Sequence, residues 1–281
     1  MIADNKIAAL LDQRAFEMFV ECTLQDPRVN NIRPNLEYIM TYASIRNLDL
    51  DAINRALQVV FMVHSGQARI GESMIEHIVK VTRNTCYFLS QHQTRCGGTD
   101  TALDSVTETA YVVGTLLHDS VEDALERVIS MLSGRDVSSK YKRTEEIQYA
   151  REEAYRLISE EFGGLATETV RLVTNPHWDK QVFSQRVRFG KYRDKIEELI
   201  KEAPFFASLL KLGDNYVNLD FEPGSTGADG MIRKYGPVCK LWIQFLNSPE
   251  AIRSINDDVR EQIIAHYELV EDWWLASQKS A

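Results

Sequence analysis

Nearly every apolar stretch of the chain has the spacing of a helix that buries one face. Apolar residues recur three and four positions apart, as in the stripe formed by Leu36, Ile39, Met40 and Ala43. Alternating polar and apolar positions, which would predict strands, are scarce. The sequence therefore predicts an all-α protein of about ten helices. The predicted segments are residues 7–16, 36–43, 52–63, 75–89, 105–117, 144–162, 166–173, 192–200, 205–219, 231–246 and 257–276.

Short breaks separate these segments, and none is long enough to mark a domain boundary by itself. The breaks lie at residues 97–98, 133–134, 163–164 and 222–227. The polar stretch 135–151 is interpreted as a surface insertion or the exposed start of a helix. We expect an N-terminal helical extension over residues 1–50 and a main domain over 51–250. Residues 251–281 should form a C-terminal helix that packs on the same domain.

Composition and charge narrow the classes of partner. The chain has 281 residues and a formal net charge of −9, a sign that repels nucleic acid, so we predict no nucleic-acid partner. The four cysteines lie far apart and form no Cys-x-x-Cys pair, which is typical of reduced thiols in a cytoplasmic protein. No apolar run approaches about eighteen residues, so we also predict no membrane span.

One predicted helix ends in four ionisable residues. Residues 110–117 are largely apolar, His118 and Asp119 follow, and Glu122 and Asp123 come one turn later. Neighbouring helical residues point about 100° apart, so His118 and Asp119 can contact one metal ion only where the helix ends or bends. Imidazole and carboxylate groups suit manganese, iron or zinc. A capping histidine followed by surface acids is the alternative, because two ligands alone do not make a site.

Two further stretches could complete such a site. His77 lies within HSGQARIGESMIEHIVKV (64–81), and Asp214 lies within LLKLGDNYVNLDF (209–221). Leucine and valine surround Asp214, and a buried lone acid costs several kcal/mol unless it is paired or bound to a metal. The alternatives are a salt bridge from Asp214 to a lysine or arginine, and a hydrogen-bonded core histidine at position 77.

In this order, the three stretches resemble the hydrolase domain of the RelA/SpoT alarmone family, a branch of the HD-domain metal phosphohydrolases. The family pattern is H-x-G-Q-x-R, Y-I-x-H-P, L-L-H-D-x-V-E-D and K-L-A-D-x-x-x-N. The corresponding stretches here are residues 64–69, 74–78, 116–123 and 211–218. The resemblance implies an HD-domain helical bundle with a metal site in its core.

The resemblance also implies a ligand set of two imidazoles and two carboxylates around Mn²⁺, the typical metal of this family. The implied ligands are His77, His118, Asp119 and Asp214. Glu122 and Asp123 would orient or deprotonate the attacking water. Another divalent ion remains an alternative to Mn²⁺.

The same resemblance implies contacts with a nucleotide. The Arg69 guanidinium would stack on the purine, and Asn218 would contact the ribose or a phosphate. The other residues implied near the pocket are His64, Gln67, Thr174 and Asn175. For His64 a structural role is an equal alternative. The basic run 186–195 could meet phosphates, although a solvated helix face is the preferred interpretation.

The expected reaction is removal of the 3′-pyrophosphate from (p)ppGpp or (p)ppApp, which yields pyrophosphate and the 5′-nucleotide. About thirty-five residues follow Leu246, too few for a second domain, so we expect a stand-alone small alarmone hydrolase. Departures from the family pattern leave the base open: Ile78 replaces the proline after His77, and Asn215 replaces the basic residue after Asp214.

Other functions remain open from the sequence. The same ligands would serve an HD-domain phosphohydrolase that acts on another nucleotide, such as a nucleotide or NADPH phosphatase. A non-catalytic helical binding module is a different class, which the complete ligand set disfavours. An antitoxin that neutralises a toxic alarmone synthetase would use the same chemistry and would be functionally paired with that enzyme. The oligomeric state is open, with a homo-oligomer among the alternatives.

Overall fold

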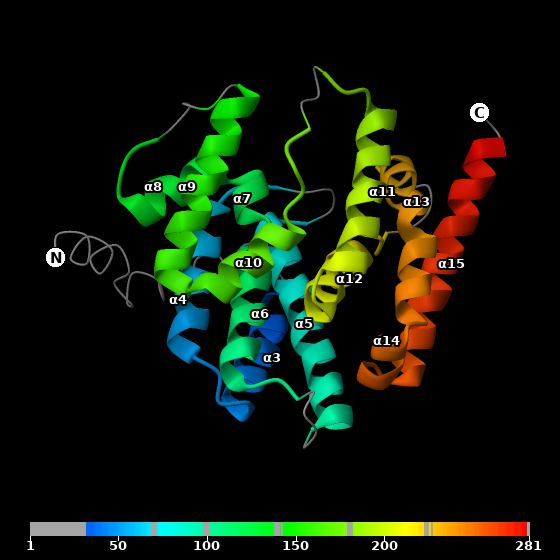
Figure 1. The fold of residues 1–281 in the computed structure, drawn as a ribbon, viewed down its shortest axis with the longest axis horizontal. Helices are drawn as coiled ribbons and strands as arrows, with labels where there is room; N and C mark the ends of the chain where they lie inside the picture. Colours follow the sequence, from blue (N-terminus) through cyan, green and yellow to red (C-terminus); the bar gives the residue numbers. More distant parts are fainter. Residues whose placement is uncertain are drawn as a thin grey trace. The chain divides into compact units, whose positions relative to one another are not determined.

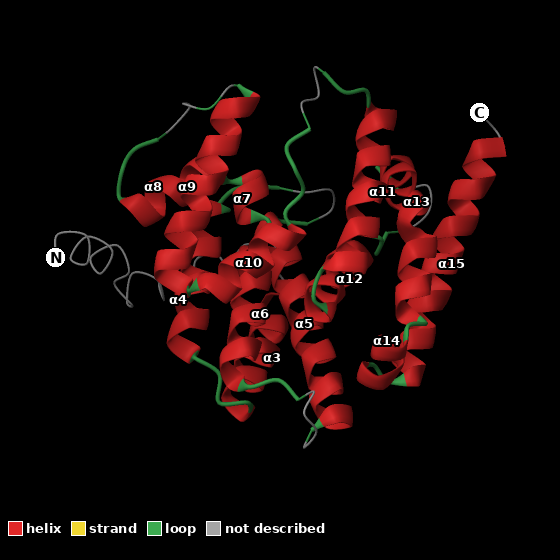
Figure 2. Ribbon diagram, in the orientation of Figure 1, coloured by secondary structure: helices red, strands yellow, loops and turns green. Residues whose placement is uncertain are grey.

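The computed structural model describes residues 32–68, 72–97, 102–137, 141, 143–178, 182–221, 225 and 227–279. These residues form helices and contain no strand, and one isolated antiparallel bridge pairs Ala68 with Ser73 (Figure 2). The prediction of an all-α protein is therefore confirmed for the described residues. The predicted segment 7–16 lies outside them, as does most of the predicted extension 1–50.

No described helix is both long enough and apolar enough to cross a membrane.

The chain divides into two compact units. The first consists of Met1–Cys86 and Asp104–His177, and the second of Tyr87–Leu103 and Trp178–Ala281, as far as these ranges are described. Helix α5, Met74–Cys96, begins in the first unit and ends in the second. The boundaries predicted at residues 50 and 250 stay predictions.

Helix α6, Ser105–Leu117, forms the centre of the first unit. Its residues from Glu108 to Leu117 are all buried, and it packs against both α4 and α10 (Figure 1). Gly114 permits the close approach of α10, because a Cβ atom there would lie 2.6 Å from Thr169 Cγ2. The other helices of this unit are α3 Ile32–Ile45, α4 Leu50–Val63, α7 Ser120–Asp123, α8 Leu125–Ser133, α9 Thr144–Phe162 and α10 Gly164–Val173.

In the second unit, α13 (Ala228–Leu246) packs against α11 and along α15 (Figure 1). The fully buried Trp242 belongs to its core. Helix α15, Asp257–Lys279, is the long C-terminal helix, and it approaches α13 closely at Gly236. The other helices of this unit are α11 Gln185–Glu202, α12 Phe205–Asn218 and α14 Pro249–Ser254.

The predicted breaks at residues 133–134 and 163–164 separate helices in the structure. Gly134 has φ +67° and caps α8, while Gly163 has φ +86° and separates α9 from α10. Both conformations are left-handed, where glycine avoids the steric cost of a side chain. Helix α8 was missed, although its buried residues have helical spacing. They are Leu125, Val128, Ile129 and Leu132.

Candidate metal centre

The end of a helix at His118 and Asp119 allows these two neighbouring side chains to approach each other. Helix α6 ends at Leu117 and α7 begins at Ser120. The His118 amide donates to the Thr115 carbonyl (3.3 Å), a three-residue turn that tightens the end of α6. As a result, His118 Nε2 lies 3.3 Å from Asp119 Oδ1.

His77 reaches the same carboxylate from α5. Its Nε2 atom lies 3.6 Å from Asp119 Oδ2, and its ring centroid lies 6.0 Å from that of His118. All three side chains are buried. Within the first unit, therefore, two imidazole nitrogens converge on one carboxylate.

The opposite ring nitrogens each lie near an acceptor, which for His118 fixes the tautomer. His118 Nδ1 lies 2.7 Å from the Thr115 carbonyl, which can only accept, so Nδ1 carries a proton. His77 Nδ1 lies 3.4 Å from Glu72 Oε1. Burial raises the pKa of the Glu72 carboxyl, but its bonds to His77 and Lys80 outweigh burial and leave that pKa below its usual value. A protonated Nδ1 leaves Nε2 available as a metal ligand.

The donor set fits a divalent cation. An unprotonated Nε2 and a carboxylate oxygen this close repel each other unless a positive charge, either a proton or a metal ion, lies between them. His77, His118 and Asp119 are buried within the first unit, and Asp214 is buried within the second. His77, His118 and Asp119 could therefore hold a divalent metal ion, and their nitrogen and oxygen donors suit manganese, iron or zinc.

Asp214 has partners on its own helix, α12, in the second unit. Lys211 Nζ donates to Asp214 Oδ2 (2.7 Å), and Asn218 Nδ2 donates to Asp214 Oδ1 (2.7 Å). The salt bridge that the sequence left open as an alternative is thus present, between two buried side chains. Asn218, which the resemblance implied as a nucleotide contact, positions the Asp214 carboxylate.

Glu122 and Asp123 differ in their surroundings. The half-buried Glu122 carboxylate accepts hydrogen bonds from the backbone and side-chain amides of Asn175 (3.1 and 3.0 Å). Arg151, buried in α9, donates to the Asn175 carbonyl (2.8 Å) and holds that residue in place. Asp123 is exposed. Of the two predicted catalytic acids, Glu122 is the one that Asn175 orients.

His64 and Gln67 support the turn between α6 and α7. Gln67 Oε1 accepts from His64 Nδ1 (2.6 Å), and His64 Nε2 lies 3.2 Å from Ser120 Oγ. Gln67 Nε2 donates to the Asp123 carbonyl (3.2 Å). Burial lowers the pKa of His64, so the imidazole is neutral near pH 7. These contacts agree with the supporting role and with the structural alternative for His64.

Thr174 also contacts the backbone of the site. Its hydroxyl donates to the Val170 carbonyl (2.7 Å) and lies 3.4 Å from the His118 carbonyl. It is buried behind the helix end. Arg69, the predicted purine contact, lies outside the described residues.

The sequence reasoning missed Glu72 and Arg151. Arg151 had a detectable signal, because it occupies a position of the buried stripe of α9 together with Ala154, Tyr155 and Ile158. A charged residue at such a position predicts a buried partner. Glu72 precedes α5 and carries no helical register, so no spacing pointed to its contact with His77.

Comparison of the chain with protein-family models, curated proteins and solved structures gives no match.

Proposed function

We propose that this protein is a metal-dependent phosphohydrolase of the HD-domain type that removes the 3′-pyrophosphate of an alarmone, (p)ppGpp or (p)ppApp. The observation that carries the proposal is the convergence of His77, His118 and Asp119 at the end of α6. Glu122 follows one turn later, and Asn175 orients its carboxylate. The four matching stretches of the sequence support the choice of substrate class.

The ion would be held by two imidazoles and two carboxylates. His77, His118 and Asp119 would supply three of these ligands, and the resemblance to the HD-domain family implies Asp214 as the fourth. When bound, a divalent ion such as Mn²⁺ lowers the pKa of its water and stabilises charge on a phosphoryl oxygen. The Thr115 carbonyl accepts from His118 Nδ1, and the Glu72 carboxylate lies 3.4 Å from His77 Nδ1, an arrangement that favours a proton on Nδ1 and leaves each Nε2 lone pair for the ion.

Glu122 is the residue that accepts a proton from the attacking water. Its carboxylate is held by two Asn175 donors, so its orientation is set before the substrate binds. The water oxygen forms a bond to the phosphorus that is attached to the ribose 3′-oxygen. The bond between this phosphorus and the 3′-oxygen breaks. The 3′-oxygen receives a proton, and pyrophosphate leaves. The proton can come from Glu122, which has taken one from the water, and the exposed Asp123 is a second group that could deliver it.

A turnover screen with added Mn²⁺ tests the proposal. The substrates are ppGpp, pppGpp, ppApp, cyclic dinucleotides, NADPH and nucleoside triphosphates, and chromatography identifies the products. We expect pyrophosphate from the 3′ position of an alarmone, with no turnover in EDTA. His118→Ala should be inactive, and His266→Gln, which changes a histidine of the second unit, serves as the matched control.

The other outcomes of the screen test the substrate and the metal dependence separately. Phosphate from another nucleotide would retain the metal chemistry and overturn the alarmone substrate. Turnover that persists in EDTA or in His118→Ala would overturn the metal-dependent mechanism. A pairing with an alarmone synthetase, as in an antitoxin, requires alarmone turnover first.

A further inference from the structure

The second unit contains a pocket of about 570 Å³ lined by residues of α11, α13 and α15. Its lining includes two arginines, two aromatic rings and two glutamines. These are Arg186, Arg233, Phe189, Trp274, Gln185 and Gln278. The volume lies within the range of about 300–1,000 Å³ that is typical of pockets for small molecules.

The two guanidinium groups of the pocket form no ion pair with any acid among the described residues. Arg233 Nε donates to the Asp229 carbonyl (3.2 Å), and in the described part of the chain neither Arg233 nor Arg186 forms an ion pair. By contrast, Arg193 on the same helix as Arg186 lies 3.8 Å from a Glu197 oxygen. The pocket therefore concentrates positive charge in a chain whose formal net charge is −9.

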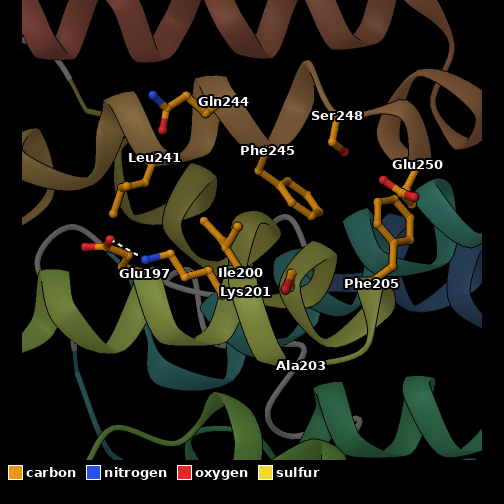
Figure 3. Close-up of a pocket in the computed structure, with 11 residues that line it drawn as sticks. Glu197, Ile200, Lys201, Ala203, Phe205, Leu241, Gln244, Phe245, Ser248 and Glu250 are labelled. Carbon is orange, nitrogen blue, oxygen red and sulfur yellow. Dashed lines mark hydrogen bonds and ion pairs between the residues drawn. The ribbon is translucent and has the colours of Figure 1, made fainter.

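A second hollow of the same unit shows the opposite charge balance. It has a volume of about 390 Å³, and its cation, Lys201, pairs with Glu197 at 2.7 Å (Figure 3). Glu250 also lines it, and Phe205 stacks on Phe245 with ring centroids 5.3 Å apart. This hollow has no uncompensated cation for an anionic ligand.

The aromatic walls of the larger pocket are accessible. A Cβ atom on Gly236 would lie 2.4 Å from Trp274 Cβ, so the glycine lets the base of the tryptophan side chain pack directly on α13. The Trp274 and Phe189 side chains are each partly exposed. Nucleic-acid bases stack on such rings without strong sequence preference.

We propose that this pocket is a second ligand site and that it binds a nucleoside polyphosphate. The Arg186 and Arg233 guanidiniums bind the phosphates, because their planar donors match phosphate oxygens. Trp274 and Phe189 contact the base. The proposal uses only residues of the second unit and does not depend on a metal ion or on the hydrolase activity.

Isothermal titration of the full chain with GTP in EDTA tests this site without metal-dependent turnover. We expect Arg186→Gln and Arg233→Gln each to weaken GTP binding about tenfold or more, the size expected for a lost charge-assisted hydrogen bond. Trp274→Leu should also weaken it. Arg253→Gln is the matched control, because this exposed arginine pairs with Glu250 and lies outside the pocket, and its affinity should equal that of the wild type. Circular dichroism verifies that each variant is folded.

Titrations with inorganic pyrophosphate and with guanosine measure the phosphate contacts and the base contacts separately. We expect each to bind at least tenfold more weakly than GTP. Absence of GTP binding at about 1 mM, or equal affinity in both arginine variants and the wild type, would overturn the proposal. Pyrophosphate binding as tight as that of GTP would also overturn the nucleotide assignment. GTP binding that persists in His118→Ala would support this site even if the hydrolase proposal failed.

Discussion

Asp119 and Asp214 are both buried carboxylates, but they are held in different ways. Asp119 lies at a helix end in the first unit, and the imidazoles near it come from different elements, 42 positions apart in the case of His77. Asp214 lies within α12 in the second unit, with partners three positions before it and four after it. A single helix brings the second set together, whereas the first set exists only when several helices pack correctly.

The two carboxylates therefore differ in how far the sequence alone predicts their surroundings. Contacts three and four positions apart follow from helical geometry, so the Lys211–Asp214–Asn218 arrangement forms in any α12 that is helical. The surroundings of Asp119 depend on the end of α6, on α5 and on the residues that hold each ring. Substitutions around Asp119 should therefore affect function most, and substitutions around Asp214 should first affect stability.

The largest effect is expected from His118→Ala in the first unit. The variant loses a ligand, and a metal ion supplies several kcal/mol of charge stabilisation, so kcat/KM should fall about a thousandfold or more. Manganese-dependent alarmone turnover measures the loss, and the helical signal in circular dichroism should be unchanged. Full activity in a folded variant would exclude His118 from the site.

The next effect is expected from Glu122→Gln. It removes the proton acceptor and keeps the ligands, so kcat should fall about 10²- to 10⁴-fold while Mn²⁺ affinity stays near that of the wild type. Asn175→Ala removes the side-chain amide that donates to Glu122 and keeps the backbone donor, so it should give a smaller fall in kcat. If Glu122→Gln retained wild-type kcat, the base would have to be another residue, with Asp123→Asn as the next variant to assay.

Lys211→Met distinguishes a structural role of Asp214 from a metal-binding role. Removing one partner of a buried pair costs about 3–5 kcal/mol, so the melting temperature in EDTA should fall clearly. If Asp214 is a ligand, Mn²⁺ should restore more stability to this variant than to the wild type, since the ion replaces the lost charge. Asp214→Asn should gain less stability from Mn²⁺ than the wild type, because it loses one ligand and keeps the other three. Equal Mn²⁺ shifts in wild type, Lys211→Met and Asp214→Asn would assign Asp214 to the salt bridge alone.

The smallest effect is expected from His266 in the second unit, which should make the stability of the protein depend on pH. Burial lowers the pKa of His266, although Asp220 acts in the opposite direction. Because the folded-state pKa lies below the unfolded value of about 6.5, the neutral form is favoured by folding. This stability is present above about pH 6.5 and is lost as the pH falls through the lowered folded-state pKa. His266→Gln should show a shallower fall in melting temperature over that range, and identical slopes would contradict the assignment.

Much of the fold was predictable because helices are encoded by local spacing. The apolar stripes predicted most described helices, and the apolar run before His118 predicted the helix end at which two candidate ligands meet. The salt bridge of Asp214 was an explicit alternative, because a leucine-rich setting requires a partner. The contact of Glu72 with His77 was not predictable, since it depends on the path of the chain before α5.

The support of Glu122 could be predicted only in part. Asn175 was implied near the pocket, but its three hydrogen bonds to Glu122 join residues 53 positions apart and depend on how the segment after α10 packs against α7. Arg151 lies in the predicted polar stretch 135–151, yet it is buried and holds Asn175. Long-range pairs of this kind follow from tertiary packing, which a single sequence does not specify.

His77, His118 and Asp119 are proposed to form part of a metal site, and Mn²⁺ binding to the chelator-stripped protein measures this most directly. Electron paramagnetic resonance follows the binding for the wild type and for Asp119→Asn. We expect a single tightly bound ion in the wild type and none in the variant, which keeps the shape of the side chain and removes its charge. A wild type that binds no ion, or a variant that binds it equally well, would show that these residues do not form a metal site.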